Sequence, residues 1–503
     1  MKSLKIKNVF LLFLSGSVAA YVVLNGIFLL SWICYVPFFI LFKKLPAKQK
    51  LTSSIIFSFG VSAVAFFWMI GAAKQFSGNR WFYALLVTFV SVTLFAIYWL
   101  VLMYVRTKLE EIAKSTVFKG VLVASSFVLG EWLLVLIFAQ MPYYLYNSGY
   151  GLLNNLYSIQ WVAHLGLPML NFITILINYL VAENIATKQW KKMLVPATIV
   201  AFFMLTGFLM KFNFDKKLPS TEVVKIAIAA ENIPANLRWD EQGGNILASR
   251  LLAINKQAAA LNPDLVLWSE STIPWPYNAT DDLLLEILKE PYSSEAIHVI
   301  GFMTAYDRHS MFNSAYAISS KGKLVGRYDK RYPLAFVETP VWGLNMPFLD
   351  LDGYLIKEGQ GAQPITTLKG KAGVVICNEI AKLKATTTLV QNGAEFLLMQ
   401  GNDGWFKDTY LVNVHFLYSR LSAVANRKDI VLNNNDGFSG HIKANGEVLL
   451  KRKSNDFFVE TAFVSPNSYD NAGRFFPNLI PLLCIIIILS TFLLNLYQSK
   501  PNS

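Results

Sequence analysis

The sequence has few cysteines, few histidines and few charged residues for its length. Of its 503 residues, three are cysteine and five are histidine, and charged residues make up 15%. Two of the cysteines, Cys34 and Cys484, lie within long apolar stretches, so no disulfide framework is predicted. The histidines lack zinc-ligand spacing and no glycine-rich phosphate loop is present, so we expect neither a metal ion nor another cofactor.

The sequence is instead rich in long apolar runs. Hydrophobic residues make up 54% of the chain, and the mean hydropathy is +0.41. A hydrocarbon core about 30 Å thick is crossed by about 20 apolar helical residues. The sequence therefore predicts a polytopic α-helical membrane bundle of about eight spans, near residues 8–24, 26–42, 52–73, 82–105, 116–139, 160–183, 193–212 and 476–497.

The distribution of basic residues predicts which way the spans run. The loops "KKLPAKQK", "RTKLEEIAK" and "TKQWKK" and the N-terminus "MKSLKIK" fall on one side under strict alternation, and basic short loops mark the cytoplasmic side. Much of the net charge of +13 lies in these loops, so nucleic acid is not an expected partner. The seventh span then exits outward, and the block after it faces away from the cytoplasm.

The chain divides into three predicted parts. Residues 1–218 form the membrane domain with seven helices, residues 219–465 form a globular domain, and residues 466–503 hold the eighth helix and a short cytoplasmic tail. In the globular block, β-branched strand signals such as "VVKIAIAA" alternate with amphipathic stretches such as "GNILASRLLAINKQAAALN". This alternation predicts an α/β or α+β sandwich with helices covering its sheets.

Three ionisable residues of this block stand at or just after predicted strand ends: Glu270, Lys330 and Cys377. Loops at strand ends expose side chains on a rigid frame. A thiol attacks a carbonyl carbon as the thiolate, so a neighbouring base and a neighbouring cation would make Cys377 a working nucleophile. Each residue alone also fits a plain structural role, because a lone cysteine usually packs as a small hydrophobe and a lone Glu or Lys is usually solvated.

Six local sequences make the joint interpretation stronger. In these stretches the chain resembles the nitrilase superfamily, and more closely the apolipoprotein N-acyltransferases, which join a nitrilase-like domain to a membrane helix bundle. The stretches stand in family order as "AAENIPANLRWDE", "LVLWSESTIPW", "GRYDKRYPLAFVE", "VVICNEI", "GNDGWF" and "NRKDIVLNNNDGFSG".

The resemblance implies a role for each candidate residue. Cys377 would be the nucleophile, Glu270 the general base, and Lys330 the cation that stabilises the thiolate and the oxyanion. Glu338 and Glu379 match further functional positions of the family, and Trp239 matches a functional tryptophan that would contact an acyl chain or support the site loop. For Trp239, a role as a core or interface aromatic is an equal alternative.

The sequence also departs from the family pattern. Asn378 stands where an aromatic residue commonly follows the nucleophile, and Ser269 stands where a proline is usual before the glutamate. The segment "LAFVE" replaces the usual Pro-Phe-Gly after the lysine. These departures bear on substrate detail and rate, and they leave the three predicted catalytic residues intact.

The implied reaction moves a fatty acyl chain from a membrane phospholipid to the N-terminal S-diacylglyceryl-cysteine amine of an apolipoprotein. It would proceed through a thioester on Cys377 with ping-pong kinetics. The expected setting is the inner membrane of a Gram-negative bacterium, with the catalytic domain in the periplasm and the protein a monomer. The alternatives are a membrane-tethered nitrilase-like amidase, in which water resolves the thioester, and a transporter or binding module whose outward domain has lost activity.

Overall fold

The computed structural model describes residues 4–142, 145–217, 222–234, 237, 240–335, 337–340, 355–469, 471 and 476–498. These residues form two compact units. A helical unit holds the helices before residue 213 and the last helix, and an α/β unit holds the strands. The α/β unit also includes the short segment Ala139–Pro142.

The helical unit contains several helices suited to a membrane. Within the described residues, six segments are long and apolar enough to span it. A seventh is obtained if α4 (Ala47–Phe66) and α5 (Met69–Phe76), which meet at a 44° bend, count as one span. The six are α1 (Ile6–Leu24), α6 (Trp81–Ile112), α7 (Thr116–Ile137), α9 (Leu167–Ala186), α10 (Leu194–Asp215, with the turn η4, Trp190–Met193, before it) and α15 (Leu479–Gln498).

The expected span at 26–42 differs from the structure. It forms two short helices, α2 (Phe28–Ser31) and α3 (Val36–Lys44), with a turn between them. Pro37 lies in the first turn of α3, where its missing N–H is tolerated, whereas inside one continuous helix it would break the hydrogen-bond ladder. The polytopic bundle is confirmed, and the part of the chain that the structure describes holds six or seven helices that could span a membrane, where the sequence predicted about eight.

Two glycines allow α1 and α4 to cross closely. A Cβ on Gly16 would lie 2.3 Å from the Phe57 carbonyl oxygen, and a Cβ on Gly60 would lie 2.3 Å from the Phe13 carbonyl oxygen. No side chain fits at such distances, so the two backbones touch through these residues. Small residues commonly permit this approach between membrane helices.

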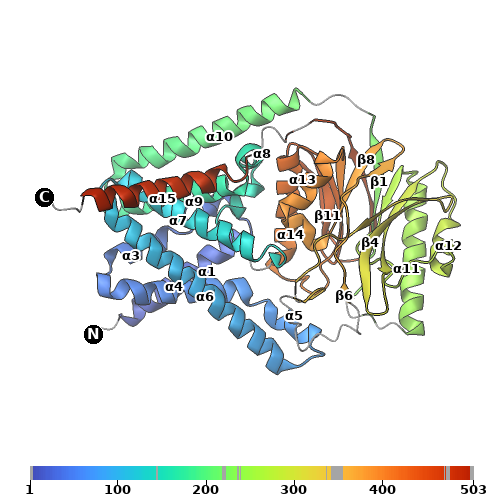
Figure 1. Cartoon of the computed structure of the whole chain (residues 1–503), viewed down its shortest axis with the longest axis horizontal. Coiled ribbons are helices and arrows are strands. Elements are labelled where there is room, and N and C mark those ends of the chain that lie inside the picture. The colour runs from blue at the N-terminus through green and yellow to red at the C-terminus, as the bar shows by residue number, and fades with distance from the viewer. Residues whose placement is uncertain are drawn as a thin grey trace. The chain divides into compact units, whose positions relative to one another are not determined.

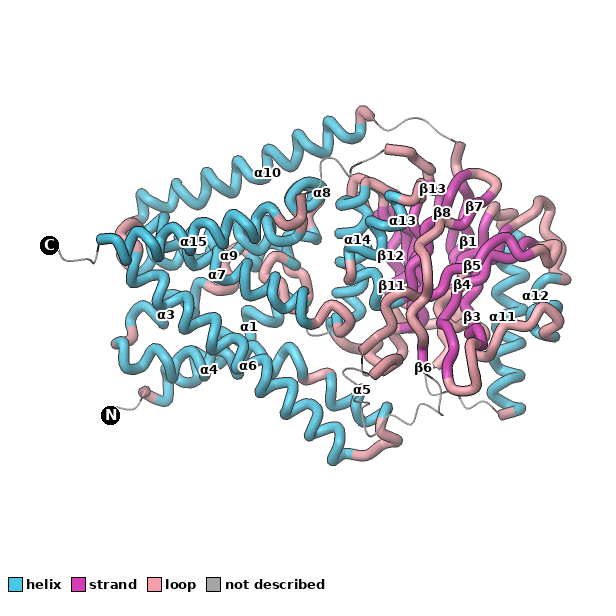
Figure 2. The backbone as a smooth tube through the Cα atoms, in the orientation of Figure 1, coloured by secondary structure: helices cyan, strands magenta, loops and turns pink. Residues whose placement is uncertain are grey.

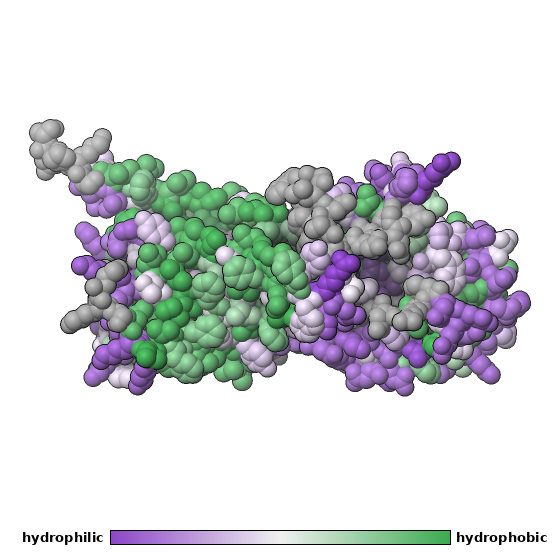
Figure 3. Space-filling model, turned by 90° about the horizontal axis from the view of Figure 1, so that it is seen from below, coloured by the Kyte–Doolittle hydropathy of each residue, from purple (hydrophilic) through white to green (hydrophobic). Residues whose placement is uncertain are grey.

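The outer faces of the helical unit are apolar. Only 17% of the spanning window is buried in α10 and in α15, which leaves large apolar side chains on their surfaces. Figure 3 shows hydrophobic residues over most of the visible face of this unit. A water-soluble unit would not expose such a continuous apolar surface, so these faces fit a lipid environment.

Two sheets form the centre of the α/β unit. The order of the first is β13-β1-β2-β3-β4-β5, with β6 beside β4, and the order of the second is β12-β11-β10-β9-β8-β7. The strands of the first sheet are β1 (Val224–Ala230), β2 (Leu265–Leu267), β3 (Ile297–Ala305), β4 (Ser310–Ser319), β5 (Leu324–Asp329), β6 (Leu355–Ile356) and β13 (Phe458–Val464). Those of the second are β7 (Ile365–Thr367), β8 (Gly370–Ile376), β9 (Phe396–Asn402), β10 (Ile430–Asn435), β11 (Phe438–Ile442) and β12 (Val448–Lys453).

Helices cover the two outer faces of this pair of sheets. Figures 1 and 2 show α11 (Glu241–Ala260) and α12 (Asp282–Leu288) on one side, and α13 (Leu383–Gln391) and α14 (Tyr410–Asn426) on the other. The predicted α/β sandwich is thus confirmed. In the first sheet β1, β2 and β3 are mutually parallel, and β5 runs in their direction because two antiparallel pairings separate it from β3. In the second, β8, β9 and β10 are parallel. In each sheet, the carboxyl ends of these strands lie at one edge.

Amide side chains tie the two sheets together. Gln400 on β9 donates through Nε2 to the carbonyl oxygens of Trp268 and Val299, at 3.0 Å each. Asn433 on β10 donates through Nδ2 to the carbonyl oxygens of Ala229 and Leu267, at 2.6 and 2.9 Å. Both amides are fully buried. Hydrogen bonds of this kind satisfy polar groups inside the core and fix how one sheet lies on the other.

Candidate active site

The three predicted catalytic residues lie just after strand ends of the α/β unit. Glu270 follows β2 and Lys330 follows β5, both in the first sheet, and Cys377 follows β8 in the second. All three side chains are buried. The amino group of Lys330 lies 3.3 Å from Oε1 of Glu270. The structure thus pairs two of the three residues directly.

Glu338 and Asn313 complete a network around Lys330. Nζ of Lys330 lies 2.9 Å from Oε2 and 3.0 Å from Oε1 of Glu338. Nδ2 of Asn313 donates to Oε1 of Glu270 at 2.9 Å and lies 3.3 Å from Oε1 of Glu338. The backbone N–H of Lys330 donates to the Asn313 carbonyl at 2.8 Å. One ammonium and one amide therefore hold two carboxylates together, and the site carries a net negative charge before the thiol is counted.

Lys330 keeps its proton in this network. Burial alone lowers its pKa, but Glu338 and then Glu270 raise it more, so that the net pKa lies well above its ordinary value. The thiolate form of Cys377 would raise it further. A fixed ammonium beside a thiol is a group that can stabilise developing negative charge.

Cys377 sits at a strained turn between β8 and the 3₁₀ turn η5 (Cys377–Ala381). Its φ is +53°, which is uncommon for a residue other than glycine and costs backbone energy. Within the described part of the chain, no hydrogen bond or ion pair joins its sulfur directly to Glu270 or Lys330. The charges of both residues nonetheless act on the thiol.

The surroundings of Cys377 hold its thiol in the neutral form. Burial makes the largest contribution and raises its pKa well above the ordinary value, and the Glu270 carboxylate raises it further. The Lys330 ammonium lowers the pKa in part. A thiol with a raised pKa needs a base to accept its proton before it can attack a carbonyl carbon, so the predicted role of Cys377 requires such a base nearby.

Glu379 fastens the Cys377 turn to the loop that carries Lys330. Its carboxylate accepts hydrogen bonds from the Tyr328 hydroxyl at 2.9 Å and from the backbone N–H groups of Arg331 at 2.7 Å and Ile376 at 2.8 Å. Tyr328 and Arg331 belong to the first sheet and its following loop, whereas Ile376 ends β8 in the second. Burial raises the pKa of Glu379, and these hydrogen bonds oppose that rise. This carboxylate therefore joins the two halves of the site.

A second buried carboxylate holds the turn that carries Glu270. Oε1 of Glu231 accepts from the Ser269 backbone N–H and from the Thr272 hydroxyl, at 3.0 Å each. Ser271 has a φ of +51°, and a Cβ on Gly301 would lie 2.4 Å from the Ser271 nitrogen. The turn is thus packed against β3 without space for a side chain. Ser269, one of the departures noted above, contributes its N–H, which proline lacks.

The remaining sequence predictions have mixed outcomes. Trp239 lies outside the described residues. Asn378 is buried and donates through Nδ2 to the Tyr332 carbonyl at 2.9 Å, so this departure from the family pattern contributes to the joint between the turn and the Lys330 loop. Sequence reasoning missed Asn313, Glu231 and Tyr328, because nothing in a strand or loop sequence reveals which buried polar group it will meet.

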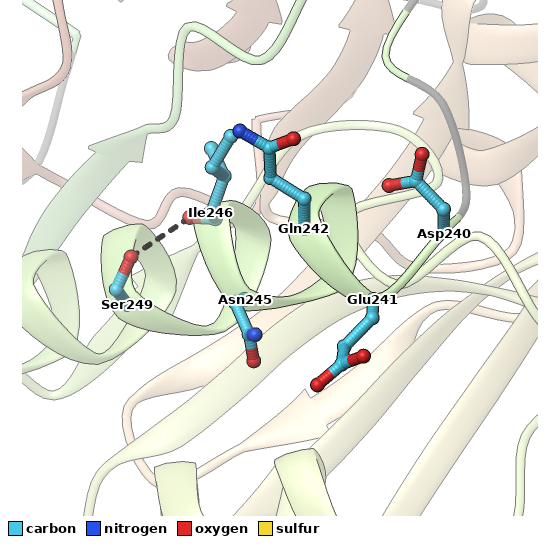
Figure 4. Close-up of a pocket in the computed structure, with 6 residues that line it drawn as sticks. All are labelled: Asp240, Glu241, Gln242, Asn245, Ile246 and Ser249. Atoms are coloured by element: carbon cyan, nitrogen blue, oxygen red, sulfur yellow. Dashed lines mark hydrogen bonds between the residues drawn. The ribbon is translucent and has the colours of Figure 1, made fainter.

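One further surface hollow lies at the start of α11. It is lined by Asp240, Glu241, Gln242, Asn245, Ile246 and Ser249, and none of the predicted site residues that the structure describes lines it. Figure 4 shows these side chains spread along the first turns of the helix, with the Ser249 hydroxyl donating to the Ile246 carbonyl. The polar groups do not converge on one point, so this hollow lacks the arrangement of a reaction site.

Comparison with known proteins gives two family matches in chain order. The model described as "Apolipoprotein N-acyltransferase N-terminal domain" matches residues 13–180, and "Carbon-nitrogen hydrolase" matches residues 225–467. A protein named apolipoprotein N-acyltransferase from Geobacter metallireducens is 23% identical over 436 residues, which cover 84% of this chain and 82% of that protein.

Two further relatives carry the same name. The one from Haemophilus ducreyi is 23% identical over 419 residues, or 80% of each chain. The one from Rickettsia typhi is 24% identical over 483 residues, which cover 92% of this chain and 93% of that protein. The similarity thus extends over both the helical unit and the α/β unit.

Proposed function

Since this chain belongs to the apolipoprotein N-acyltransferase family within the nitrilase superfamily, and is a multi-pass membrane acyltransferase, we propose how its site performs the reaction. The chain takes a fatty acyl group from a membrane phospholipid and passes it to the N-terminal amine of a lipoprotein whose cysteine already bears a diacylglyceryl thioether. Cys377 carries the acyl group between the two substrates.

The first half-reaction forms the acyl-enzyme. Glu270 accepts the Cys377 proton as the sulfur attacks the ester carbonyl carbon, and the Lys330 ammonium stabilises the thiolate and the oxyanion. The C–S bond forms, the C–O bond breaks, and Glu270 gives its proton to the departing lysophospholipid oxygen. The thioester that remains is reactive enough for attack by an amine.

The second half-reaction transfers the acyl group. The lipoprotein amine attacks the thioester carbonyl carbon, Glu270 accepts a proton from the nitrogen, and the C–S bond breaks as the amide forms. Glu270 then returns the proton to the sulfur. One base thus serves both half-reactions.

The observation that carries this proposal is the Lys330 network. An ammonium held by Glu270 and Glu338 in a buried site acts on a thiol whose environment otherwise disfavours the thiolate. A purely structural cysteine needs no fixed cation of this kind.

The charge pattern of the loops supports the placement of the reaction. With basic short loops in the cytoplasm, the α/β unit faces the periplasm of a bacterial inner membrane. Both substrates are anchored in the membrane by their lipid chains, and the enzyme's own helices keep its site in the same membrane as these substrates. We expect the protein to act as a monomer.

The direct test is to trap the acyl-enzyme. The full chain is incubated with a phospholipid bearing a labelled acyl group, and the mass of the Cys377 peptide is measured. We expect one acyl adduct on Cys377, none in Cys377→Ala, and an unchanged adduct in the controls Cys34→Ala and Cys484→Ala. No adduct on the wild-type protein would contradict the proposal. An adduct that is released only to water when a diacylated lipopeptide is added would indicate an amidase.

A further inference from the structure

A buried Asp–His pair lies beside the predicted catalytic residues. Asp403 directly follows β9, the strand that pairs with β8, and both strands run parallel toward the edge where Cys377 lies. His415 is on α14, which packs against η5, the turn that begins with Cys377. Nδ1 of His415 lies 2.7 Å from Oδ1 of Asp403, and both side chains are buried. The topology thus brings a second acid–base pair to the site.

The pair is fixed in one orientation. Oδ2 of Asp403 is occupied by Nδ2 of Asn434, at 2.6 Å, and the Phe406 ring packs edge-to-face against the imidazole, with centroids 5.7 Å apart. A carboxylate facing Nδ1 holds the ring proton on that nitrogen. Nε2 then bears the lone pair, and within the described residues it has no hydrogen-bond partner. His415 is thus oriented to accept a proton through Nε2.

Charges of the site and of the pair act on one another. Around His415 lie Asp403 at the end of β9, Glu270 after β2, Lys330 after β5, and η5 with Cys377 and Glu379. Burial lowers the pKa of His415, but Asp403 and then Glu270 raise it more, and the net pKa lies above 6.5. The Asp403 carboxylate also raises the pKa of the Cys377 thiol.

The proposed reaction leaves one proton without an acceptor. An α-amine with an ordinary pKa near 8 arrives mostly as an ammonium at neutral pH, and its nitrogen must lose two protons to become an amide. Glu270 passes one of them to the Cys377 sulfur. The other must leave the site, and Glu270 cannot hold both.

We infer that the Asp403–His415 pair accepts this first proton from the lipoprotein ammonium during the second half-reaction. Nε2 of His415 takes a proton from the R–NH₃⁺ group, Asp403 stabilises the resulting imidazolium, and the freed amine attacks the thioester. His415 later releases its proton to water. The inference rests on the proposed function and adds to it a base for the lipid-anchored amine, separate from the base for the thiol.

The test separates the two half-reactions. The full chain is first acylated with a labelled phospholipid, and a diacylated lipopeptide is then added at pH values from 6 to 9. In His415→Gln we expect acyl-enzyme formation at the wild-type rate and aminolysis slowed about 100-fold at pH 7. The defect should shrink toward pH 9, because there most of the amine enters without the extra proton.

Two companion variants control for structural damage. His441 and Asp429 form another buried pair in the same unit, at 3.3 Å, and Asp429 is not among the charges with the largest effect on the pKa of the Cys377 thiol. His441→Gln should leave the pH dependence of aminolysis unchanged. Asp403→Asn should move the acidic limb of aminolysis to lower pH, because the carboxylate no longer raises the pKa of His415. This variant decides the matter if His415→Gln does not fold.

Three results would overturn the inference. Aminolysis unchanged in His415→Gln would remove His415 from the reaction. An equal loss in both half-reactions at every pH would assign it a structural role. If the wild-type protein forms no acyl-enzyme, the proposed function fails and this inference fails with it, whereas the first two results leave the proposed function standing.

Discussion

At the scale of single residues, the proposed nucleophile Cys377 lies in surroundings that oppose its ionisation. Burial and Glu270 raise the pKa of its thiol, and Lys330 lowers it only in part. The same Glu270 charge that disfavours the thiolate is the base the proposed reaction needs. A change at Glu270 should therefore have opposite effects on the ease of ionisation and on acyl transfer.

This opposition gives the first prediction. In a background with Cys34 and Cys484 replaced by alanine, alkylation of Cys377 by iodoacetamide is followed against pH. In Glu270→Gln the rise of the alkylation rate with pH should move to lower pH, because one negative charge beside the thiol is lost. Acyl-enzyme formation should fall about 100-fold or more, because the base is lost. Lys330→Met should move the rise of the alkylation rate to higher pH. If the pH dependence of Cys377 alkylation is the same in both variants as in the wild-type protein, the charges of Glu270 and Lys330 do not act on the thiol.

Glu379 gives a second prediction at this scale. In Glu379→Gln the side chain keeps its size, but its NH₂ group faces backbone donors that it cannot satisfy, so about 3 kcal/mol of stability should be lost. Acyl-enzyme formation should fall with it, because the Cys377 turn is no longer tied to the Lys330 loop. Thermal unfolding and acylation rate are the measurements. The control Glu286→Gln, at an exposed position, should alter neither the unfolding midpoint nor the acylation rate. Full activity in Glu379→Gln would show that the Glu379 hydrogen bonds between the Cys377 turn and the Lys330 loop are not needed for the reaction.

At the scale of helices and strands, the periodicity and charge of the sequence predicted most elements, but not the contacts between them. The spans, the sandwich and the strand ends that carry Glu270, Lys330 and Cys377 follow from apolar runs and alternation in the sequence. The break between α2 and α3 and the bend between α4 and α5 do not, since an apolar run looks alike whether its helix is straight or interrupted. The partners of the site residues, Asn313 and Glu231, depend on tertiary packing and could not be read in advance.

The crossing of α1 and α4 supplies the prediction at this scale. Gly60→Ala places a methyl group where the Phe13 carbonyl leaves no room, so the helices must part and stability should fall by about 1–3 kcal/mol. The midpoint of thermal unfolding of the purified full chain in detergent measures the loss. Gly71→Ala is the matched control, since a Cβ there meets nothing within 4 Å. Equal midpoints in the two variants would show that the close approach does not stabilise the unit.

At the scale of the whole molecule, the direction in which the chain crosses the membrane decides which substrates can reach Cys377. The span count alone does not determine this direction, because the pair α2 and α3 and the bent pair α4 and α5 each admit two interpretations. The basic loops do predict it, and the prediction can be checked in intact cells.

The topology test uses single cysteines in a chain whose native cysteines are replaced by alanine. Lys289→Cys places an exposed thiol on the α/β unit, and Lys191→Cys places one in the basic turn before α10. A maleimide small enough to pass the outer membrane but unable to cross the inner one should label position 289 in whole cells and position 191 only after lysis. The reverse pattern would place the α/β unit in the cytoplasm.

The bonds that cross between the sheets have a consequence for how activity is lost. Glu270 and Lys330 follow strands of one sheet, and Cys377 follows a strand of the other. Their relative positions depend on the hydrogen bonds of Glu379, Gln400 and Asn433 between the two sheets. If these hydrogen bonds weaken and one sheet shifts slightly against the other, every strand stays intact and the circular dichroism spectrum is unaltered. Such a protein would look native and be inert, so inactivation on warming should precede any visible melting.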